Sequence, residues 1–320
     1  MNRGDDLSRP ALREDMIALL RCPVTGARLV AADPDLATHD GSRRYARSAK
    51  GIPLFAAEAC SAETRKQQAH YEAIASAYVA NLSYPHTEEY VAYLDETLLA
   101  AMEGGSFATV AEICCGTGEG FALLGGRAGR GVGIDISPSM LAEAVRRHPG
   151  GRIAFAQGDA TALPLADAAF DSVIMLGGIH HVNDRRGLFR EISRILKPGG
   201  TFYFREPVSD FILWRVIRNI IYRLSPILDH ETERPLLYEE TVPLLKDAGL
   251  ECRTWRTCGF VGFCLFMNSD VLMFNRLFRF LPGIRGVTRF FARLDDWVLR
   301  RRGLRRAGLL VIGVAGKPLG

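Results

Sequence analysis

The chain has 320 residues, of which 48% are apolar and 24% are charged, a composition typical of a globular protein with a sizeable core. Its formal net charge of +4 is too small to indicate a nucleic-acid-binding protein. The first residues lack the features of a secretory signal, and no apolar run reaches the length of a membrane span. The 7 Cys are odd in number and include no C-x-x-C pair, which predicts reduced thiols and a cytoplasmic protein.

The first part of the chain, residues 1–60, is predicted to form a small irregular module. A short helix from Ala11 to Leu20 leads into the sequence Arg21-Cys22-Pro23-Val24-Thr25-Gly26, and Gly51 to Phe55 is predicted to form a strand. Residues 61–104 carry apolar side chains at helical spacing and are predicted to form a helical cap.

From residue 105 to 208, short apolar strands alternate with helices. The strands are predicted at 108–114, 131–136, 153–157, 172–176 and 201–204. Strands that alternate with helices at this spacing pair in parallel through right-handed crossovers. Residues 209–320 are predicted to add helical insertions and two more strands, at 251–257 and 309–315. The expected fold is an α/β protein with a doubly wound, mostly parallel, seven-stranded sheet.

A glycine-rich turn follows the first of these strands, in the sequence Glu112-Ile113-Cys114-Cys115-Gly116-Thr117-Gly118. Ligands of open parallel sheets bind at the carboxyl ends of strands, and glycine lets the backbone approach them closely. Asp135 ends the second strand, 17 residues after Gly118, where an acid can accept both hydroxyls of a ribose. Asp159 ends the third strand, where a carboxylate can receive the exocyclic amine of adenine.

Two further acids, Glu112 and Glu119, flank this turn. A pyrophosphate ligand favours a helix N-terminus with few carboxylates nearby. The acids therefore indicate a nucleoside cofactor with a cationic sulfonium and ammonium rather than a dinucleotide.

The segment from Glu112 to Gly118 resembles motif I of the class I S-adenosylmethionine (SAM)-dependent methyltransferases, in particular the small-molecule enzymes that include the ubiquinone and menaquinone C-methyltransferases. Phe170-Asp171-Ser172-Val173 and Leu196-Lys197-Pro198-Gly199-Gly200 are similar to later landmarks of that family. The resemblance covers roughly residues 65–207 and the last strand. It implies a Rossmann-like methyltransferase fold, SAM as the cofactor and methyl transfer to a small molecule. One departure is Cys114, where the family usually has glycine; cysteine is also small, so SAM binding is still expected.

The resemblance also implies roles for individual residues. Asp135 matches the ribose-binding acid of the family, and Asp159-Ala160 matches its adenine-binding pair. The backbone of Gly116 and Gly118 would face the methionine moiety, and Tyr71 on the preceding helix would close over its carboxylate. The full set of expected SAM contacts is Tyr71, Glu112, Cys114, Gly116, Gly118, Asp135, Ile136, Asp159, Ala160 and Leu176.

Three residues are candidates for catalysis. A general base is needed only when the acceptor keeps its proton at neutral pH, as a phenol or sugar hydroxyl does. His180 and His181 follow the fourth strand, where the related family has its substrate-facing loop; one of the two is expected to face the acceptor and the other to pack. Glu206 follows the fifth strand and is expected beside the same cleft, as a substrate contact or as the partner of Arg205 or another neighbour. His230-Glu231 is a weaker alternative.

The N-terminal module resembles the zinc-ribbon-like domain of the small activator subunit of tRNA methyltransferases, on the sequences Leu20-Arg21-Cys22-Pro23 and Gly51-Ile52-Pro53-Leu54. A zinc site needs four ligands, usually in paired spacing. Thr25 stands where a second Cys would be, and no second pair exists. We therefore expect a structural remnant without a metal.

The segment from residue 259 to 306 is rich in aromatic and basic residues. Between Arg276 and Arg306 there are ten Arg against only Asp295 and Asp296. Apolar rings beside Arg can make peripheral membrane contact or bind a lipophilic anionic substrate. Alternatively, they form a helical lid whose rings pack inward and whose Arg are solvated. Together with Trp214, Ile220, Ile221 and Tyr222 of the other insertion, the segment indicates an apolar acceptor pocket.

Two other functions compete with small-molecule methylation. Some relatives use SAM for cyclisation or other non-methyl chemistry that releases methylthioadenosine, and the cofactor motifs do not exclude it. The N-terminal module and the basic segment would also suit an RNA or protein methyltransferase. The Asn/Asp-Pro-Pro-Tyr signature typical of base and amide N-methylation is absent, because Leu176-Gly177-Gly178-Ile179 stands there, so no nucleic-acid partner is expected. The acceptor, its atom (O, C or N) and the oligomeric state stay open.

Overall fold

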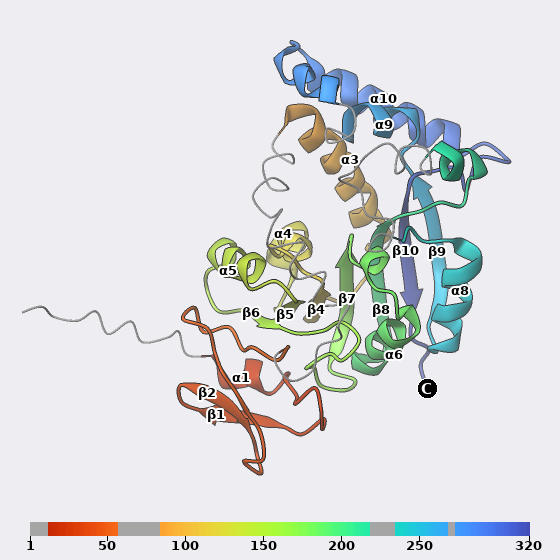
Figure 1. Cartoon of the computed structure of the whole chain (residues 1–320). Coiled ribbons are helices and arrows are strands. Elements are labelled where there is room, and N and C mark those ends of the chain that lie inside the picture. The colour runs from red at the N-terminus through yellow and green to blue at the C-terminus, as the bar shows by residue number, and fades with distance from the viewer. Residues whose placement is uncertain (1–11, 57–83, 218–233, 268–272) are drawn as a thin grey trace, which may run out of the picture.

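The computed structural model describes residues 12–56, 84–217, 234–267 and 273–320. Its centre is a seven-stranded sheet with the order β6-β5-β4-β7-β8-β10-β9 (Figure 1). Strands β4 to β8 pair in parallel, whereas β10 runs antiparallel to both β8 and β9. The strands are β4 (Thr109–Ile113), β5 (Arg130–Asp135), β6 (Ile153–Gln157), β7 (Phe170–Leu176), β8 (Leu196–Pro207), β9 (Glu251–Cys258) and β10 (Leu310–Gly316). The predicted doubly wound, mostly parallel sheet is confirmed.

Two of the helices that connect these strands, α5 and α6, begin at a side-chain cap. The Ser137 side chain accepts a hydrogen bond from the N–H of Met140 at 3.3 Å, and the Asp184 carboxylate accepts one from the N–H of Gly187 at 2.9 Å. Each bond satisfies an N–H group that a helix start otherwise leaves unpaired. The helices are α4 (Glu119–Leu124), α5 (Pro138–Arg147), α6 (Arg185–Ile195) and α8 (Tyr238–Asp247).

The middle of the sheet is buried on both faces. Val110, Ala111 and Ile113 of β4 have no exposed surface, as expected for a parallel strand covered by helices on both sides. One glycine in the antiparallel part is required by packing. Gly313 of β10 lies opposite Phe204 of β8, and a Cβ added there would lie 1.9 Å from the Phe204 ring. The ring therefore occupies the space that any other residue would fill.

The N-terminal module contains a three-stranded antiparallel sheet that was not predicted. Its strands are short and partly polar, so they give a weak sequence signal. The helix expected at 11–20 is confined to one turn, and only Leu54 of the expected strand at 51–55 pairs in parallel with β6, at Gln157. The elements are α1 (Glu14–Ile17), β1 (Leu29–Ala32), β2 (Asp35–Thr38) and β3 (Arg44–Tyr45).

This module shares its apolar core with the large sheet. Leu20 pairs with Leu165, and the buried Met16 belongs to the same cluster of apolar side chains as the central strands. Cys22, expected at the remnant of a zinc site, is buried with its Sγ 3.0 Å from the Tyr45 hydroxyl. Among the residues that the structure describes, no three His, Cys, Asp or Glu side chains gather as metal ligands.

A group of helices lies over the end of the sheet at which β9 finishes (Figure 1). We call residues 259–306 the helical insertion. Its helix α10 packs on α3 and on α9, while α3 also contacts α4 and β10, so α3 links the insertion to the sheet. The helices are α3 (Pro85–Ala101), α9 (Val261–Met267), the 3-10 helix η3 (Met273–Phe280) and α10 (Ile284–Leu299).

A buried carboxylate, Asp295 of α10, joins these helices. It accepts hydrogen bonds from the Tyr90 hydroxyl of α3 at 2.7 Å and from the N–H groups of Phe260, Gly262 and Phe263 at the start of α9. Burial, and then the nearby Asp295 charge, raises the pKa of the Tyr90 hydroxyl, which stays a donor. Asp295 thus ties α3, α9 and α10 together.

The aromatic side chains of the helical insertion divide between the interior and the surface. The Phe266 ring lies 5.7 Å from Phe278 and 5.6 Å from Phe291, centre to centre, inside the helical group. Phe290 and Trp297 on α10 are exposed. The interpretation of this segment as a lid whose rings pack inward is therefore correct for only some of the rings. No helix in the described part of the chain is both long and apolar enough to cross a membrane.

Candidate functional site

The glycine-rich turn lies at the carboxyl end of β4, where the strand order changes direction between β5 and β7. Gly116 and Gly118 have φ values of +50° and +84°, a left-handed conformation that favours glycine. An added Cβ at Gly118 would lie 2.5 Å from Nε2 of His148, whereas the space around Gly116 is open. The turn thus presents bare backbone at the switch point, where doubly wound sheets bind ligands.

Asp135 connects the end of β5 to this turn. Its Oδ2 accepts a hydrogen bond from the N–H of Gly116 at 2.8 Å, and its Oδ1 accepts one from the N–H of Ser137 at 2.9 Å. The carboxylate is half-buried, so it remains accessible to a ligand beside the turn. This position suits the ribose contact implied by the family resemblance, which stays a prediction.

Asp159 is the buried acid at the end of β6. Its Oδ1 accepts hydrogen bonds from the N–H and the hydroxyl of Thr161, at 2.8 and 2.7 Å. Ala160 is buried next to it, and Ile136 offers a half-buried side chain at the end of β5, with its carbonyl bound to the Gln157 amide. These residues form the part of the edge at which an adenine is predicted.

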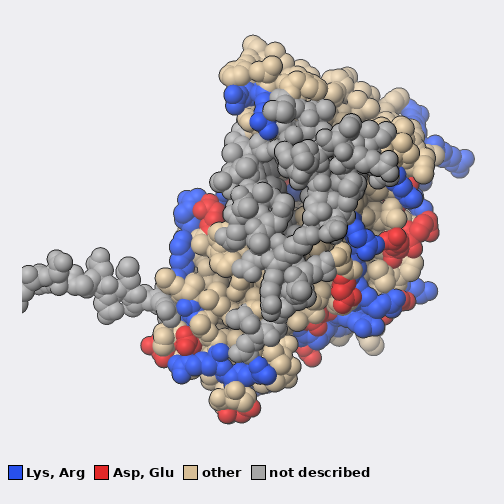
Figure 2. Space-filling view, viewed as in Figure 1, with Lys and Arg blue, Asp and Glu red and all other residues tan. Residues whose placement is uncertain are grey.

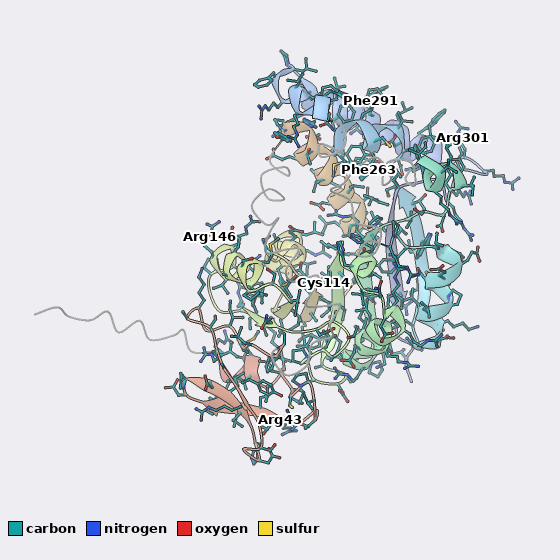
Figure 3. All side chains as sticks on the ribbon, in the orientation of Figure 1. Arg43, Cys114, Arg146, Phe263, Phe291 and Arg301 are labelled. Carbon is teal, nitrogen blue, oxygen red and sulfur yellow. The ribbon has the colours of Figure 1, made fainter. Side chains whose placement is uncertain are left out.

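Cys114 lies at the middle of this edge, with Phe263 and Phe291 of the helices above it (Figure 3). Burial raises the pKa of its thiol, and the carboxylates of Asp135, Glu206 and Asp159 raise it further. Acids from the ends of three different strands therefore lie within electrostatic reach of Cys114. A concentration of negative charge at a strand edge favours a cationic ligand.

The Cys114 backbone has a φ of 51°, which is unusual for a residue other than glycine. This conformation explains why the resembling family has glycine here. The Cys114 side chain packs against the next loop, because a Cβ added at Gly178 would lie 2.6 Å from the Cβ of Cys114. The departure from the family pattern is accommodated by a glycine on the facing loop.

Glu112 is buried beneath the glycine-rich turn. Its Oε1 accepts a hydrogen bond from the N–H of Gly120 at 2.7 Å, and its Oε2 accepts one from the N–H of Phe121 at 3.0 Å. Burial raises its pKa to about 8, although these two N–H groups oppose the shift. In this arrangement Glu112 holds the first turn of α4 against β4, and its direct contact with a cofactor stays a prediction.

A second loop, after β7, is organised by Glu206 of β8. The Glu206 carboxylate accepts hydrogen bonds from the N–H groups of Gly178 at 2.7 Å, Ile179 at 2.9 Å and His180 at 3.3 Å. It also binds Nδ1 of the His180 ring at 2.8 Å. One buried carboxylate thus fixes both the backbone of this loop, which includes the 3-10 helix η2 (Ile179–His181), and the ring of its first histidine.

Glu206 was expected either to contact substrate or to pair with Arg205 or another neighbour. The structure buries its side chain, with an exposed fraction of 0%, and pairs it with His180. A direct contact between Glu206 and substrate stays a prediction. Arg205 pairs instead with Asp95 of α3, at 2.5 Å. His181 stacks beside His180, with ring centres 3.8 Å apart, so the two predicted histidines do lie together.

Arg185, at the start of α6, is a residue that sequence reasoning missed. Its guanidinium is buried, donates to the backbone carbonyl of Arg234 and lies within electrostatic reach of Glu206. Burial lowers its pKa, and the Arg234 charge lowers it further. A basic residue in the first turn of a helix opposes the helix dipole, and that signal could have singled it out.

Two of the remaining candidates lie outside the described residues: Tyr71 and the His230-Glu231 pair. Leu176, the last residue of β7, is half-buried at the edge between the glycine-rich turn and the histidine loop. The structure therefore brings together the candidates from the ends of β4, β5, β6, β7 and β8.

Comparison with known proteins gives a consistent result. A family model described as a methyltransferase domain matches residues 111–204. The 2-phytyl-1,4-naphtoquinone methyltransferase of Thermosynechococcus vestitus is 39% identical over 32% of this chain and 46% of its own length. A chloroplastic 2-phytyl-1,4-beta-naphthoquinone methyltransferase of Arabidopsis thaliana is 30% identical over 48% of this chain and 69% of its own. A demethylmenaquinone methyltransferase of Listeria monocytogenes is 31% identical over 50% of this chain and 71% of its own length.

Solved structures share the fold at lower identity. A chain from a complex between a methyltransferase activator and a putative methyltransferase of Haloferax volcanii is 21% identical, with a TM-score of 0.52 over 78% of this chain and 96% of that one. A SAM-dependent methyltransferase of Thermotoga maritima, described as a possible histamine N-methyltransferase, is 19% identical. Its TM-score is 0.52 over 78% of this chain and 99% of that one.

These relatives confirm the resemblance seen in the glycine-rich turn, the acidic strand ends and the later landmarks. The alternative of non-methyl SAM chemistry is not favoured, because the matching relatives are methyltransferases by name. The matches to the cyanobacterial and plant enzymes cover between about half and two thirds of those relatives' lengths. The chain belongs to the class I SAM-dependent methyltransferases, in the family that includes the quinone methyltransferases.

Proposed function

We propose that this protein transfers the methyl group of SAM to a small lipophilic acceptor of the quinol or phenol type. The observation that carries the proposal is the buried Glu206, which holds the His180 loop next to the glycine-rich turn. The names of the quinone methyltransferase relatives support an aromatic, lipophilic acceptor. The inward-packed rings of the helical insertion support an apolar route to the site.

The residues at the strand edge fit SAM. The open space at Gly116 admits a ligand against the backbone, and Asp135 offers a half-buried carboxylate beside it. The acids around Cys114 suit the positive charges of a sulfonium and an ammonium. We assign the methionine moiety to Gly116 and Gly118, the ribose to Asp135, and the adenine to the Asp159-Ala160 end of β6.

When bound, SAM supplies an electrophilic methyl group on a sulfonium that leaves as a neutral thioether. The protein's own contribution is to hold the acceptor in line and to exclude water, which is worth about 7–11 kcal/mol in well-oriented systems. His180 accepts the proton of the acceptor at Nε2, because Nδ1 already bonds to Glu206.

Glu206 acts on this step through His180. A carboxylate at Nδ1 fixes the ring orientation and its tautomer, and it stabilises the imidazolium that forms when Nε2 takes a proton. The same carboxylate holds three N–H groups of the loop, so the ring and the loop backbone are positioned together. The buried Arg185 offsets the negative charge of Glu206.

The direct test is incubation of the purified protein with methyl-labelled SAM and a panel of quinols, phenols, sugars, RNA and protein substrates. We expect label in a quinol or phenol and release of S-adenosylhomocysteine. Release of methylthioadenosine instead would contradict methyl transfer, and label in sugars alone would contradict the lipophilic acceptor. Label in RNA or protein would favour the remaining alternative.

The role of the histidine loop is tested with His180→Gln, compared with His181→Gln as the matched control. We expect the His180 variant to lower kcat by about 100-fold or more, since general bases contribute that much. The affinity for S-adenosylhomocysteine, measured by titration calorimetry, should stay within about 2-fold of the parent for both variants. Equal rates in the His180 variant and the parent would remove His180 as the base.

We also propose that the protein works in the cytoplasm and without a nucleic-acid partner. The cysteines support the cytoplasmic location, since all six that the structure describes are free thiols. A reducing compartment is where such thiols persist.

A further inference from the structure

Helix α10 carries two apolar faces, and only one of them is buried. Ile284, Thr288, Ala292, Asp295 and Leu299 face the interior. A second row consists of Val287, Phe290, Leu294 and Trp297, which recur at helical spacing of three and four residues and are exposed to solvent. Phe290 is 61% exposed and Trp297 is 56% exposed. Large apolar side chains in a continuous exposed row mark a contact surface rather than a chance feature.

The neighbouring 3-10 helix η3 extends this surface. Phe274, Leu277 and Phe280 are exposed and follow each other at intervals of three residues, which is one turn of a 3-10 helix, so they share one face. Figure 2 shows the upper end of the molecule, where α10 lies in Figure 1, as a largely uncharged surface with basic patches at its margins. We call the two exposed rows together the apolar face of the insertion.

The basic side chains around this face outnumber the acids that pair with them. Arg285 and Arg289 pair with Glu88, Glu89 and Glu96 of α3, and Arg306 pairs with Glu239. Asp295 is buried and bound to α9, and Asp296 pairs with Arg256 at 2.6 Å and with Arg300 at 2.7 Å, so neither acid offsets the other basic residues here. Arg293 and Arg302 have no carboxylate partner among the described residues. A surface of this kind attracts an anionic partner.

Two arginines lie directly on the rings. The guanidinium of Arg301 stands 4.1 Å from the centre of the Trp297 ring, and that of Arg279 stands 4.7 Å from Phe280. Aromatic rings paired with long basic side chains suit a boundary between water and lipid, because the ring enters the apolar layer while the charge stays with the headgroups. Trp297 lies in the last turn of α10, and Figure 3 shows Arg301 just beyond that helix.

We propose that the apolar face of the insertion docks on an anionic phospholipid membrane, and that the enzyme takes its lipophilic acceptor from there. The route to the site rests on the proposed function; the docking itself does not. A second copy of this chain fits less well, because a two-fold contact through this face would bring the arginine-rich segments of both copies together. An anionic lipid membrane suits both features of this face, because its apolar layer accepts the exposed rings and its headgroups attract the basic side chains around them.

The position of the face agrees with this role. The helical insertion follows the carboxyl end of β9, which is parallel to β8 and ends on the same side as the glycine-rich turn and the histidine loop. α10 packs on α3, and α3 packs on α4. Docking would therefore place the membrane beyond the helices that cover the site, with the sheet held away from it.

The test is flotation of the full-length protein with vesicles of phosphatidylcholine alone or mixed with an equal amount of phosphatidylglycerol. We expect binding to the mixed vesicles to be at least about 10-fold tighter, since each arginine near an anionic surface contributes about 1 kcal/mol. The variant Phe290→Ser with Trp297→Ser should lose about 10-fold or more of this binding. Val30→Ser, at an exposed apolar residue of β1 in the N-terminal module, is the matched control and should bind as the parent does.

Three outcomes would overturn the docking proposal: no binding to either vesicle, equal loss in the control variant, or a dimer that the double substitution dissociates in sedimentation. The double variant should still methylate a short-chain, water-soluble quinol at the parent rate, while its rate on vesicle-borne quinol falls. If vesicles are bound but no acceptor is methylated, the proposed function fails and the docking stands. If the soluble quinol is methylated without vesicle binding, only the docking fails.

Discussion

The strand edge and the helical group hold their buried carboxylates alike and differ in their apolar side chains. At the edge, backbone N–H groups bind both oxygens of Glu112 and of Glu206, and in the helical group they bind both oxygens of Asp295. Buried polar atoms without a hydrogen-bond partner occur near the edge, on His148 and Arg185, as well as in the helices. The large apolar side chains of β4 to β8 are buried or half-buried, whereas η3 and α10 expose rows of them. The edge is thus the enclosed half, and the helical group is the half that presents apolar side chains to solvent.

This difference matches the division of labour that we propose. SAM is common to the family, so its contacts sit on strand ends that tolerate little change. The acceptor differs between relatives, and a region with exposed rings can be altered at lower cost to the fold. The variants below, from the largest expected effect to the smallest, test whether the two halves are as separable as this comparison suggests.

The largest effect is expected at the edge, from Asp135→Ala. The substitution removes the acceptor for the N–H groups of Gly116 and Ser137 as well as the proposed ribose contact. Hydrogen bonds to charged groups contribute about 1.5–3 kcal/mol each, so affinity for S-adenosylhomocysteine should fall by about 100-fold or more. Titration calorimetry measures this. Asp247→Ala, an exposed acid on α8, is the control, and unchanged affinity in the Asp135 variant would remove the ribose assignment.

The next effect is expected in the helices, from Asp295→Asn. An amide cannot accept all the hydrogen bonds that reach this carboxylate from Tyr90, Phe260, Gly262 and Phe263, so at least one buried donor loses its partner. We expect a loss of about 1–3 kcal/mol in the free energy of unfolding, measured by denaturant titration.

For the Asp295→Asn variant we also expect the affinity for S-adenosylhomocysteine to stay near that of the parent, because the substitution lies in the helices and not at the strand edge. Asp296→Asn is the matched control, since its ion pairs are partly exposed and worth about 1 kcal/mol or less. A large loss of cofactor affinity in Asp295→Asn would show that the two halves are coupled.

A pH effect is expected from His86, the unpaired histidine of α3. Burial lowers its pKa, so the folded protein resists protonation while the unfolded chain does not. The unfolded state therefore binds more protons, and stability falls as pH drops through about 6.5, the ordinary histidine value. His86→Phe, next to Tyr84 and Phe278, should remove this loss. Melting temperatures of variant and parent should diverge below that pH, and parallel curves would contradict the assignment.

The smallest effect is expected from Cys114→Gly at the centre of the edge. Glycine adopts the observed φ of 51° without strain, and the strain of a left-handed side-chain residue is about 1–2 kcal/mol. The greater flexibility of glycine in the unfolded chain offsets part of this gain. We expect a rise in stability of up to about 1 kcal/mol by denaturant titration, with SAM affinity retained. A marked loss of stability would mean that the thiol's packing on the Gly178 loop outweighs the strain.

The sheet was predictable because its signals are local. The parallel strands are largely apolar runs that end at or near a glycine or an acid, so the strand at 153–157 was placed at its observed bounds. The strand at 251–257 was placed within one residue at each end although most of its residues are polar. The edge residues followed from the same local signals, since Asp135 and Asp159 stand at strand ends. Strands β1 to β3 were missed because their few residues give no periodic pattern and gain their order from contact with the large sheet.

The rest depends on contacts between distant residues. Glu206 binds a histidine loop about 26 residues away in the chain, and no spacing rule links the two. On α10, Phe290 is exposed and the adjacent Phe291 is packed inside. A helix with apolar residues on two sides does not reveal which side faces the core, so the sequence alone left both interpretations of the insertion open.

The pairing between the N-terminal module and β6 affects more than the module itself. The N–H of Phe55 donates to the carbonyl of Gln157 at 3.1 Å, and the N–H of Gln157 donates to the carbonyl of Pro53 at 2.9 Å. β6 is an edge strand of the sheet, and its unpaired backbone N–H and C=O groups would otherwise be open to pairing with a strand of another chain. By pairing with β6, the module covers this sheet edge and prevents edge-to-edge association of two copies of the chain. It also braces the strand directly before Asp159, so the module supports the end of the site at which we propose that adenine binds.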